Sequence, residues 1–103
     1  MQITTQCCEG RFVIRLSGSM RGREVAQLTH VVRETRHSLV VVDLKELTFI
    51  DSCGIGGLIY SSQLLKTQTR QLVLTSPPDF VKDILDNFIA ADLIEVEPLS
   101  SPA

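Results

Sequence analysis

The chain has 103 residues, of which 44% are hydrophobic, so it is long enough to form one domain with its own core. Its net charge of −2 gives no electrostatic reason to expect nucleic acid or an anionic membrane as a partner. Residues 1–5 lack the basic and apolar regions of a signal peptide, and no apolar run approaches the roughly 20 residues that span a bilayer. We therefore expect a cytoplasmic protein.

The cysteine content argues against a disulfide framework and against a metal site. Three cysteines make an odd number, and none has a partner at metal-ligand spacing. Cys7 and Cys8 are adjacent in a strand-like segment, where their side chains would point to opposite faces. We expect three reduced thiols, no bound metal and no cofactor.

The first third of the chain predicts a β-hairpin followed by a helix. Residues 2–8 and 11–17 read as two strands, because apolar residues alternate along the second one, and Glu9-Gly10 suits a tight turn between them. Gly18-Ser19 is expected to end the second strand. Residues 22–36 place apolar side chains at helical spacing, with charged residues between them.

The remaining elements alternate between strands and helices. Strands are predicted at residues 39–44, a β-branched run typical of a buried parallel strand, and at 71–75. Helices are predicted at 55–67 and at 80–87, the second capped by Asp79. Residues 90–93 suggest a last short turn or helix, residues 94–96 an edge strand, and residues 98–103 a flexible polar tail after a domain over 1–97.

The order ββαβαβα(α)β predicts an α/β domain with a mixed, largely parallel sheet of four to five strands. The crossover rule would place the helices mainly on one face. Loops that follow the central strands gather at one edge of such a sheet, where ligands usually bind. The Asp51-Ser52 loop belongs to that edge.

Asp51 and Ser52 stand where a strand-side loop turns into a helix, and two interpretations are open. In the first, Asp51 or Ser52 is the N-cap of the helix, which stabilises the helix by about 1 kcal/mol. Alternatively, Ser52 is a modification site, since a phosphate would add nearly two negative charges at the positive end of a helix. Such a phosphate would stand beside Asp51, which repels it.

Catalytic and nucleotide-binding motifs find little support around this loop. His30 and His37 are the only histidines and are distant from Ser52 in sequence, and no glycine stands two residues before Ser52 as a nucleophile elbow requires. Cys53 is either a nucleophile near a helix N-terminus or, more simply, a small buried residue that fills a tight loop. The nearby glycines lack a Walker lysine and are typical of close backbone packing.

At this point the sequence resembles a known family. Residues 40–44, 47–56 and Leu58 are similar to the signature of STAS domains, specifically the stand-alone bacterial anti-sigma factor antagonists. Residues 12–18 resemble the second strand of that family, and 81–85 with 93–94 resemble its late helix and final strand. The resemblance covers residues 2–97, in the order of elements given above.

The resemblance implies a function without catalysis. In that family, the serine after the aspartate is phosphorylated by an anti-sigma factor that is also a serine kinase with a histidine-kinase-like ATPase fold. The unphosphorylated antagonist binds this kinase and frees its client, and a metal-dependent serine phosphatase reverses the modification. Carried over, Ser52 is the phosphoacceptor, and the partner-binding residues are Asp51, Ser52, Cys53, Gly54, Ile55, Gly56, Leu58 and Arg21. We expect a monomer.

The sequence departs from the family pattern at two positions, and two alternative functions stay open. Arg21 stands where many relatives carry an aspartate, so it either alters kinase recognition or pairs with the phosphoserine. Cys53 replaces the usual serine or alanine. The first alternative function is a scaffold subunit of an ABC-type lipid transport complex, in which Ser52 is an unmodified cap. The second is a small hydrolase that uses Ser52 or Cys53.

Overall fold

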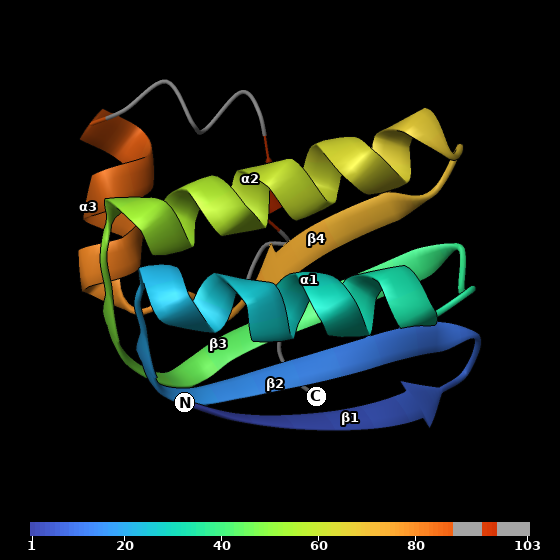
Figure 1. The fold of residues 1–103 in the computed structure, drawn as a ribbon, viewed down its shortest axis with the longest axis horizontal. Helices are drawn as coiled ribbons and strands as arrows, with labels where there is room; N and C mark the ends of the chain where they lie inside the picture. The colour runs from blue at the N-terminus through green and yellow to red at the C-terminus, as the bar shows by residue number, and fades with distance from the viewer. Residues whose placement is uncertain (88–93, 97–103) are drawn as a thin grey trace.

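The computed structural model describes residues 1–87 and 94–96. Its centre is one mixed β-sheet. Its strands lie side by side in chain order, with β1 antiparallel to β2 and every later neighbour parallel (Figure 1). They are β1 (Gln2–Cys8), β2 (Arg11–Met20), β3 (Leu39–Ile50), β4 (Gln71–Thr75) and β5 (Glu95–Val96). The predicted α/β class with a mixed sheet is confirmed.

The hairpin forms where the sequence predicts it, and its second strand is longer than expected. Glu9 and Gly10 both have positive φ, 49° and 82°, as a two-residue hairpin turn of type I′ requires. The prediction that Gly18-Ser19 ends the strand was wrong. Gly18 takes φ 92°, which glycine adopts readily, and the register with β3 shifts at this point. β2 therefore continues to Met20.

β3 also runs past its predicted end at residue 44 and reaches Ile50. Val40, Val41 and Val42 are all buried, although their side chains alternate between the two faces of the sheet. This is the pattern expected of a central strand. The extension pairs Met20 with Ile50, so β2 and β3 end side by side, and β3 leads directly to Asp51.

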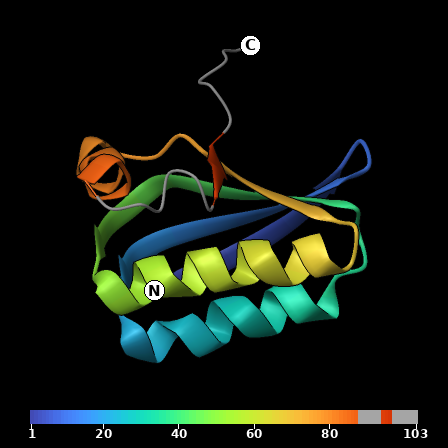
Figure 2. The ribbon, with the colours of Figure 1, turned by 90° about the horizontal axis from the view of Figure 1, so that it is seen from above.

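Two helices cover one face of the sheet. A short 3-10 turn (Gly22–Glu24) leads into α1 (Val25–Glu34), and α2 (Ser52–Thr67) lies beside α1 on the same side (Figures 1 and 2). Their apolar sides join one core with the strands, with Leu28, Leu58 and Leu65 fully or almost fully buried. α2 begins three residues before the predicted Ile55.

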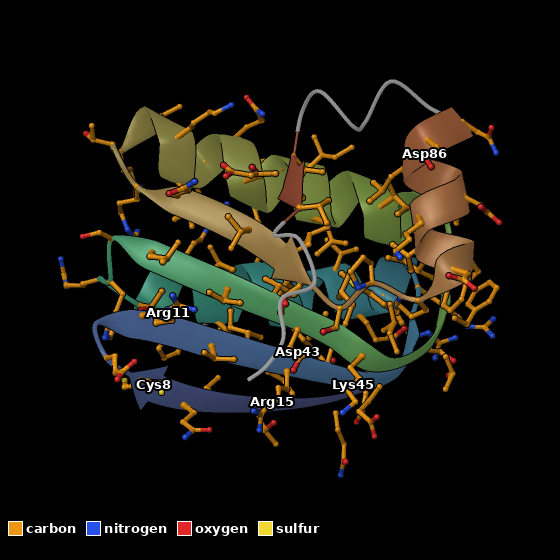
Figure 3. The ribbon with its side chains drawn as sticks, turned by 180° about the vertical axis from the view of Figure 1, so that it is seen from behind. Cys8, Arg11, Arg15, Asp43, Lys45 and Asp86 are labelled. Carbon is orange, nitrogen blue, oxygen red and sulfur yellow. The ribbon has the colours of Figure 1, made fainter. Side chains whose placement is uncertain are left out.

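The third helix, α3 (Asp79–Asn87), lies on the other side of the sheet from α1 and α2 (Figures 2 and 3). Val81 and Leu85 anchor it in the core. The expected edge strand near residues 94–96 is present as β5, next to β4. The expected turn at 90–93 and the tail at 98–103 lie outside the described residues.

Candidate functional site at the start of α2

The Asp51-Ser52 segment lies at the end of the sheet where β2 and β3 both finish. The backbone N–H of Asp51 donates to the carbonyl of Met20 at 3.2 Å, which ties the end of β3 to the end of β2. The carbonyl of Asp51 in turn accepts from the N–H of Ile55 at 3.0 Å, the first bond of α2. The helix therefore starts directly on the sheet, without an intervening loop.

Asp51 is the N-cap of α2, which resolves the choice between Asp51 and Ser52. Its backbone is extended, and its Oδ1 accepts from the N–H of Gly54 at 2.8 Å. Its Oδ2 accepts from the N–H of Gly22 at 3.3 Å, from the turn that follows β2. One carboxylate thus holds the start of α2 and the start of the 3-10 turn together.

Ser52 is the first residue of α2, and its side chain is exposed. Its hydroxyl has no hydrogen-bond partner among the described residues. The position is at the positive end of the helix, where backbone N–H groups and the helix dipole favour negative charge. The hydroxyl is therefore accessible from outside the protein, at a helix end that favours negative charge.

Glycine at position 54 is required by close packing. A Cβ added there would lie 2.6 Å from Cγ1 of Ile50 and 2.8 Å from the carbonyl oxygen of Met20, both too close. Gly57 similarly packs against Val25 of α1, with an added Cβ at 2.8 Å from Cγ1. These glycines let α2 sit tightly on the sheet and on α1, as the sequence predicted for close backbone packing.

The eight residues proposed from sequence as partner-binding divide into a buried set and a surface set. Gly54, Ile55 and Leu58 are buried, so they can only support the surface. The expectation of a buried Cys53 was wrong, because this residue is exposed, although it lies close to Gly22. The other surface members are Arg21, Asp51, Ser52 and Gly56, of which Asp51 is half-buried.

One exposed aromatic residue, Phe49, adds to this surface, and a second, Tyr60, lies further along α2. Phe49 is 41% exposed, and the guanidinium of Arg21 lies over its ring at 4.7 Å from the centroid. Tyr60 is 46% exposed on α2, and its hydroxyl oxygen accepts from Nη2 of Arg33 at 2.6 Å. Sequence reasoning did not assign Phe49 to the site, although Phe49 lies within the segment 47–56 that resembles the family signature.

The two histidines lie at the other end of the molecule. His37 follows α1, stacks on Phe12 and shares a hydrogen bond with the Thr35 hydroxyl, and His30 lies on α1 nearby. Figure 1 shows α1 ending at the opposite end of the helical layer from the start of α2. The described residues contain no group of three His, Cys, Asp or Glu side chains suited to a metal ion. None of the described helices is long and apolar enough to cross a membrane.

Comparison with known proteins now identifies the family. The sequence matches the STAS domain over residues 2–101, so the chain belongs to the STAS domain family. No match was found among curated proteins.

Solved structures support the fold independently. The unphosphorylated anti-sigma factor antagonist SpoIIAA is similar with a TM-score of 0.71 and 15% identity, over 96% of this chain and 90% of that one. The phosphorylated form of SpoIIAA from Bacillus gives a TM-score of 0.72 and 16% identity, over 93% and 91%. A serine-to-glutamate variant of RsbS from Moorella thermoacetica gives 0.72 and 15%, over 97% and 89%. At these identities the likeness concerns the fold.

Proposed function

We propose that this protein is an anti-sigma factor antagonist that switches partners through phosphorylation of Ser52, and that it catalyses no reaction itself. The observation that carries the proposal is the exposed Ser52 hydroxyl on the first residue of α2, held in place by the Asp51 cap. Membership of the STAS family and the similarity to both forms of SpoIIAA support it.

The partner proposed for the unphosphorylated state is an anti-sigma factor with serine kinase activity and a histidine-kinase-like ATPase fold. It would dock on the exposed surface around Ser52, which includes Phe49, Cys53 and Gly56. Gly56 has no atom within 4 Å of an added Cβ, so the backbone of α2 is open to an approaching surface there. Docking would release the client sigma factor in the cytoplasm.

Phosphorylation would reverse this docking for an electrostatic reason. The Ser52 hydroxyl oxygen attacks the γ-phosphorus of ATP, ADP leaves, and the hydroxyl proton passes to a base of the kinase. The phosphate brings nearly two negative charges next to the carboxylate of Asp51. A partner surface matched to a neutral hydroxyl would have to bury that charge, which is strongly unfavourable. A metal-dependent serine phosphatase would restore the binding form.

The experiment is phosphorylation by a candidate anti-sigma kinase with ATP, followed by mapping of the modified residue by mass spectrometry. We expect a single phosphate on Ser52 and none on Ser52→Ala. Thr48→Val is the matched control, because Thr48 is an exposed hydroxyl at the end of β3 and should leave labelling unchanged. Labelling that persists in Ser52→Ala would contradict the proposal. Stable binding without any phosphorylation would favour a scaffold role instead.

A further inference from the structure

The outer edge of β1 is a long, uncharged strand edge in the described part of the molecule. β1 pairs only with β2, so one side of this seven-residue strand carries free backbone N–H and C=O groups. Its side chains are Gln, Ile, Thr and Cys, without charge, proline or glycine. Proteins normally protect such edges with charges, prolines or bulges, because an open edge pairs readily with another strand.

The opposite edge of the sheet provides a contrast. β5 has only two residues, and one of them is Glu95. A short edge with a charge is a poor template for pairing. Of the two edges, only β1 has the length and composition to accept a further strand.

The hairpin turn determines which backbone groups of β1 are free. The two residues Glu9 and Gly10 form the turn, so the flanking pair of Cys8 and Arg11 is hydrogen-bonded. Hydrogen-bonded and non-hydrogen-bonded pairs alternate along an antiparallel ladder. The N–H and C=O groups of Ile3, Thr5 and Cys7 therefore point outward, to the open edge.

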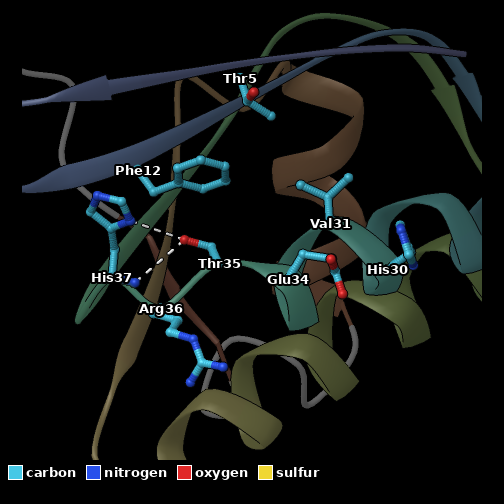
Figure 4. A pocket seen from close by; sticks show the side chains of 8 residues that line it. All are labelled: Thr5, Phe12, His30, Val31, Glu34, Thr35, Arg36 and His37. Atoms are coloured by element: carbon cyan, nitrogen blue, oxygen red, sulfur yellow. Dashed lines mark hydrogen bonds between the residues drawn. The ribbon is translucent and has the colours of Figure 1, made fainter.

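A groove lies beside this strand on the helical side of the sheet. It has a volume of about 660 Å³, and Figure 4 shows Thr5 and Phe12 of the hairpin facing Val31 near the end of α1. The rim carries both signs of charge, with Glu34 next to Arg36. If two copies of the protein met at this rim, like-charge repulsion would therefore not dominate the contact.

From these features we propose that β1 pairs antiparallel with β1 of a second copy of this chain, with Thr5 opposite Thr5 on a two-fold axis. Ile3 would then stand opposite Cys7 of the second copy, so all three outward-facing residues find hydrogen-bonded partners. No two charged side chains face each other along the strands. All seven residues of each β1 strand are paired, since Gln2 stands opposite Cys8 of the second copy. The two sheets become one continuous sheet.

The groove also favours β1 of a second copy, paired with Thr5 opposite Thr5. Ile3 packs partly on the core on the helical side of the sheet, and Cys7 lies opposite Phe12 on β2. Ile3 of the second copy would lie beside Cys7 on that side, next to the groove wall formed by Phe12. An apolar side chain would thus extend each groove lining across the two-fold axis.

This pairing leaves the Ser52 surface open and does not depend on the proposed function. β2 separates β1 from β3, which leads to Ser52, and the open edge faces away from α2 (Figure 1). The expected monomer rested on keeping the docking surface free, a condition that such a dimer also meets.

Sedimentation over a wide range of protein concentrations tests the dimer. Thr5→Lys would place two ammonium groups opposite each other, and we expect about tenfold weaker dimerisation or more. The matched double variant Thr4→Lys, Gln6→Glu would create two opposite-charge pairs across the interface, so it should dimerise at least as tightly as the native chain. A native chain that stays monomeric throughout, or a dimer that Thr5→Lys does not weaken, overturns the proposal.

A cross-link tests the register separately. Gln2 and Cys8 of the second copy would form a non-hydrogen-bonded pair with Cα atoms about 4.5 Å apart, a separation that suits a disulfide. Gln2→Cys should therefore give a covalent dimer under mild oxidation, joined between positions 2 and 8 in peptide mass spectra. The control is Gln2→Cys with Cys8→Ser, in which this link cannot form. Failure of Gln2→Cys to cross-link, or equal cross-linking in the control, overturns the register.

Discussion

Asp51 and Gly54 are joined by a 2.8 Å hydrogen bond from the glycine N–H to Oδ1 of the carboxylate, and this bond sets the position of Ser52 between them. Oδ2 of the same carboxylate accepts from the N–H of Gly22. The residue before the candidate phosphoacceptor is thus fully engaged in holding two elements. These bonds fix the backbone of Ser52 at the start of α2.

Loss of this cap should destabilise the fold moderately. We expect Asp51→Ala to lower the free energy of unfolding by about 1 kcal/mol, and by up to about 2 kcal/mol because the bond to Gly22 is lost as well. Urea unfolding followed by circular dichroism measures the change. Asp83→Ala is the control, because Asp83 is an exposed acidic residue inside α3. An equal effect for both variants would mean that the Asp51 bonds contribute nothing.

Two glycines of α2 should respond in opposite directions to the same substitution. Gly54→Ala forces a methyl group against the Met20 carbonyl, which is backbone and cannot move away easily, so we expect a loss of about 1–3 kcal/mol. Gly56→Ala meets nothing and removes a helix-interior glycine, so we expect a gain of about 0.5–1 kcal/mol. Chemical denaturation of both variants measures the difference. Equal effects would contradict the close packing of Gly54.

The sequence locates the junction between β3 and α2, because the cap signal there is local, although it places the helix start at Ile55 rather than at Ser52. Aspartate is a favoured N-cap residue in any fold, and Asp51 takes that place. The element boundaries were harder, since Gly18 reads as a strand end and only pairing with β3 shows that it bends the strand. The sequence did not predict the stacking of Arg21 on Phe49 or the proximity of Gly22 to Cys53, because these contacts join residues far apart in the chain that only the fold brings together.

The charge of residue 52 should control partner binding. Ser52→Asp places one negative charge at the helix N-terminus, which the fold tolerates, so its unfolding free energy should change little. We expect its affinity for the kinase to fall at least tenfold, while Ser52→Ala keeps the affinity of the unmodified protein. Isothermal titration calorimetry with the kinase measures both. An unchanged affinity of Ser52→Asp would contradict release by charge.

Arg21 offers a test of how the phosphate is stabilised within the protein itself. In the unmodified chain, Arg21→Met removes an exposed cation–π contact with Phe49, which is worth about 0.5–1 kcal/mol. The 3-10 turn that begins after Arg21 is tied to Asp51 through Gly22, so the backbone of Arg21 is close to the start of α2. If its guanidinium turns toward the phosphate, the same substitution should destabilise the phosphorylated protein more strongly than the unmodified one.

The measurement is a cycle of four unfolding free energies, with and without the phosphate and with Arg21 or methionine at position 21. We expect a coupling of about 1 kcal/mol at low salt that shrinks as salt is raised, because the pair is exposed and therefore screened. Arg23→Met is the matched control, since the guanidinium of Arg23 is directed to Glu24 at 4.0 Å. A coupling of zero for Arg21 would leave this arginine to act on the kinase alone, through the surface that it shares with Phe49.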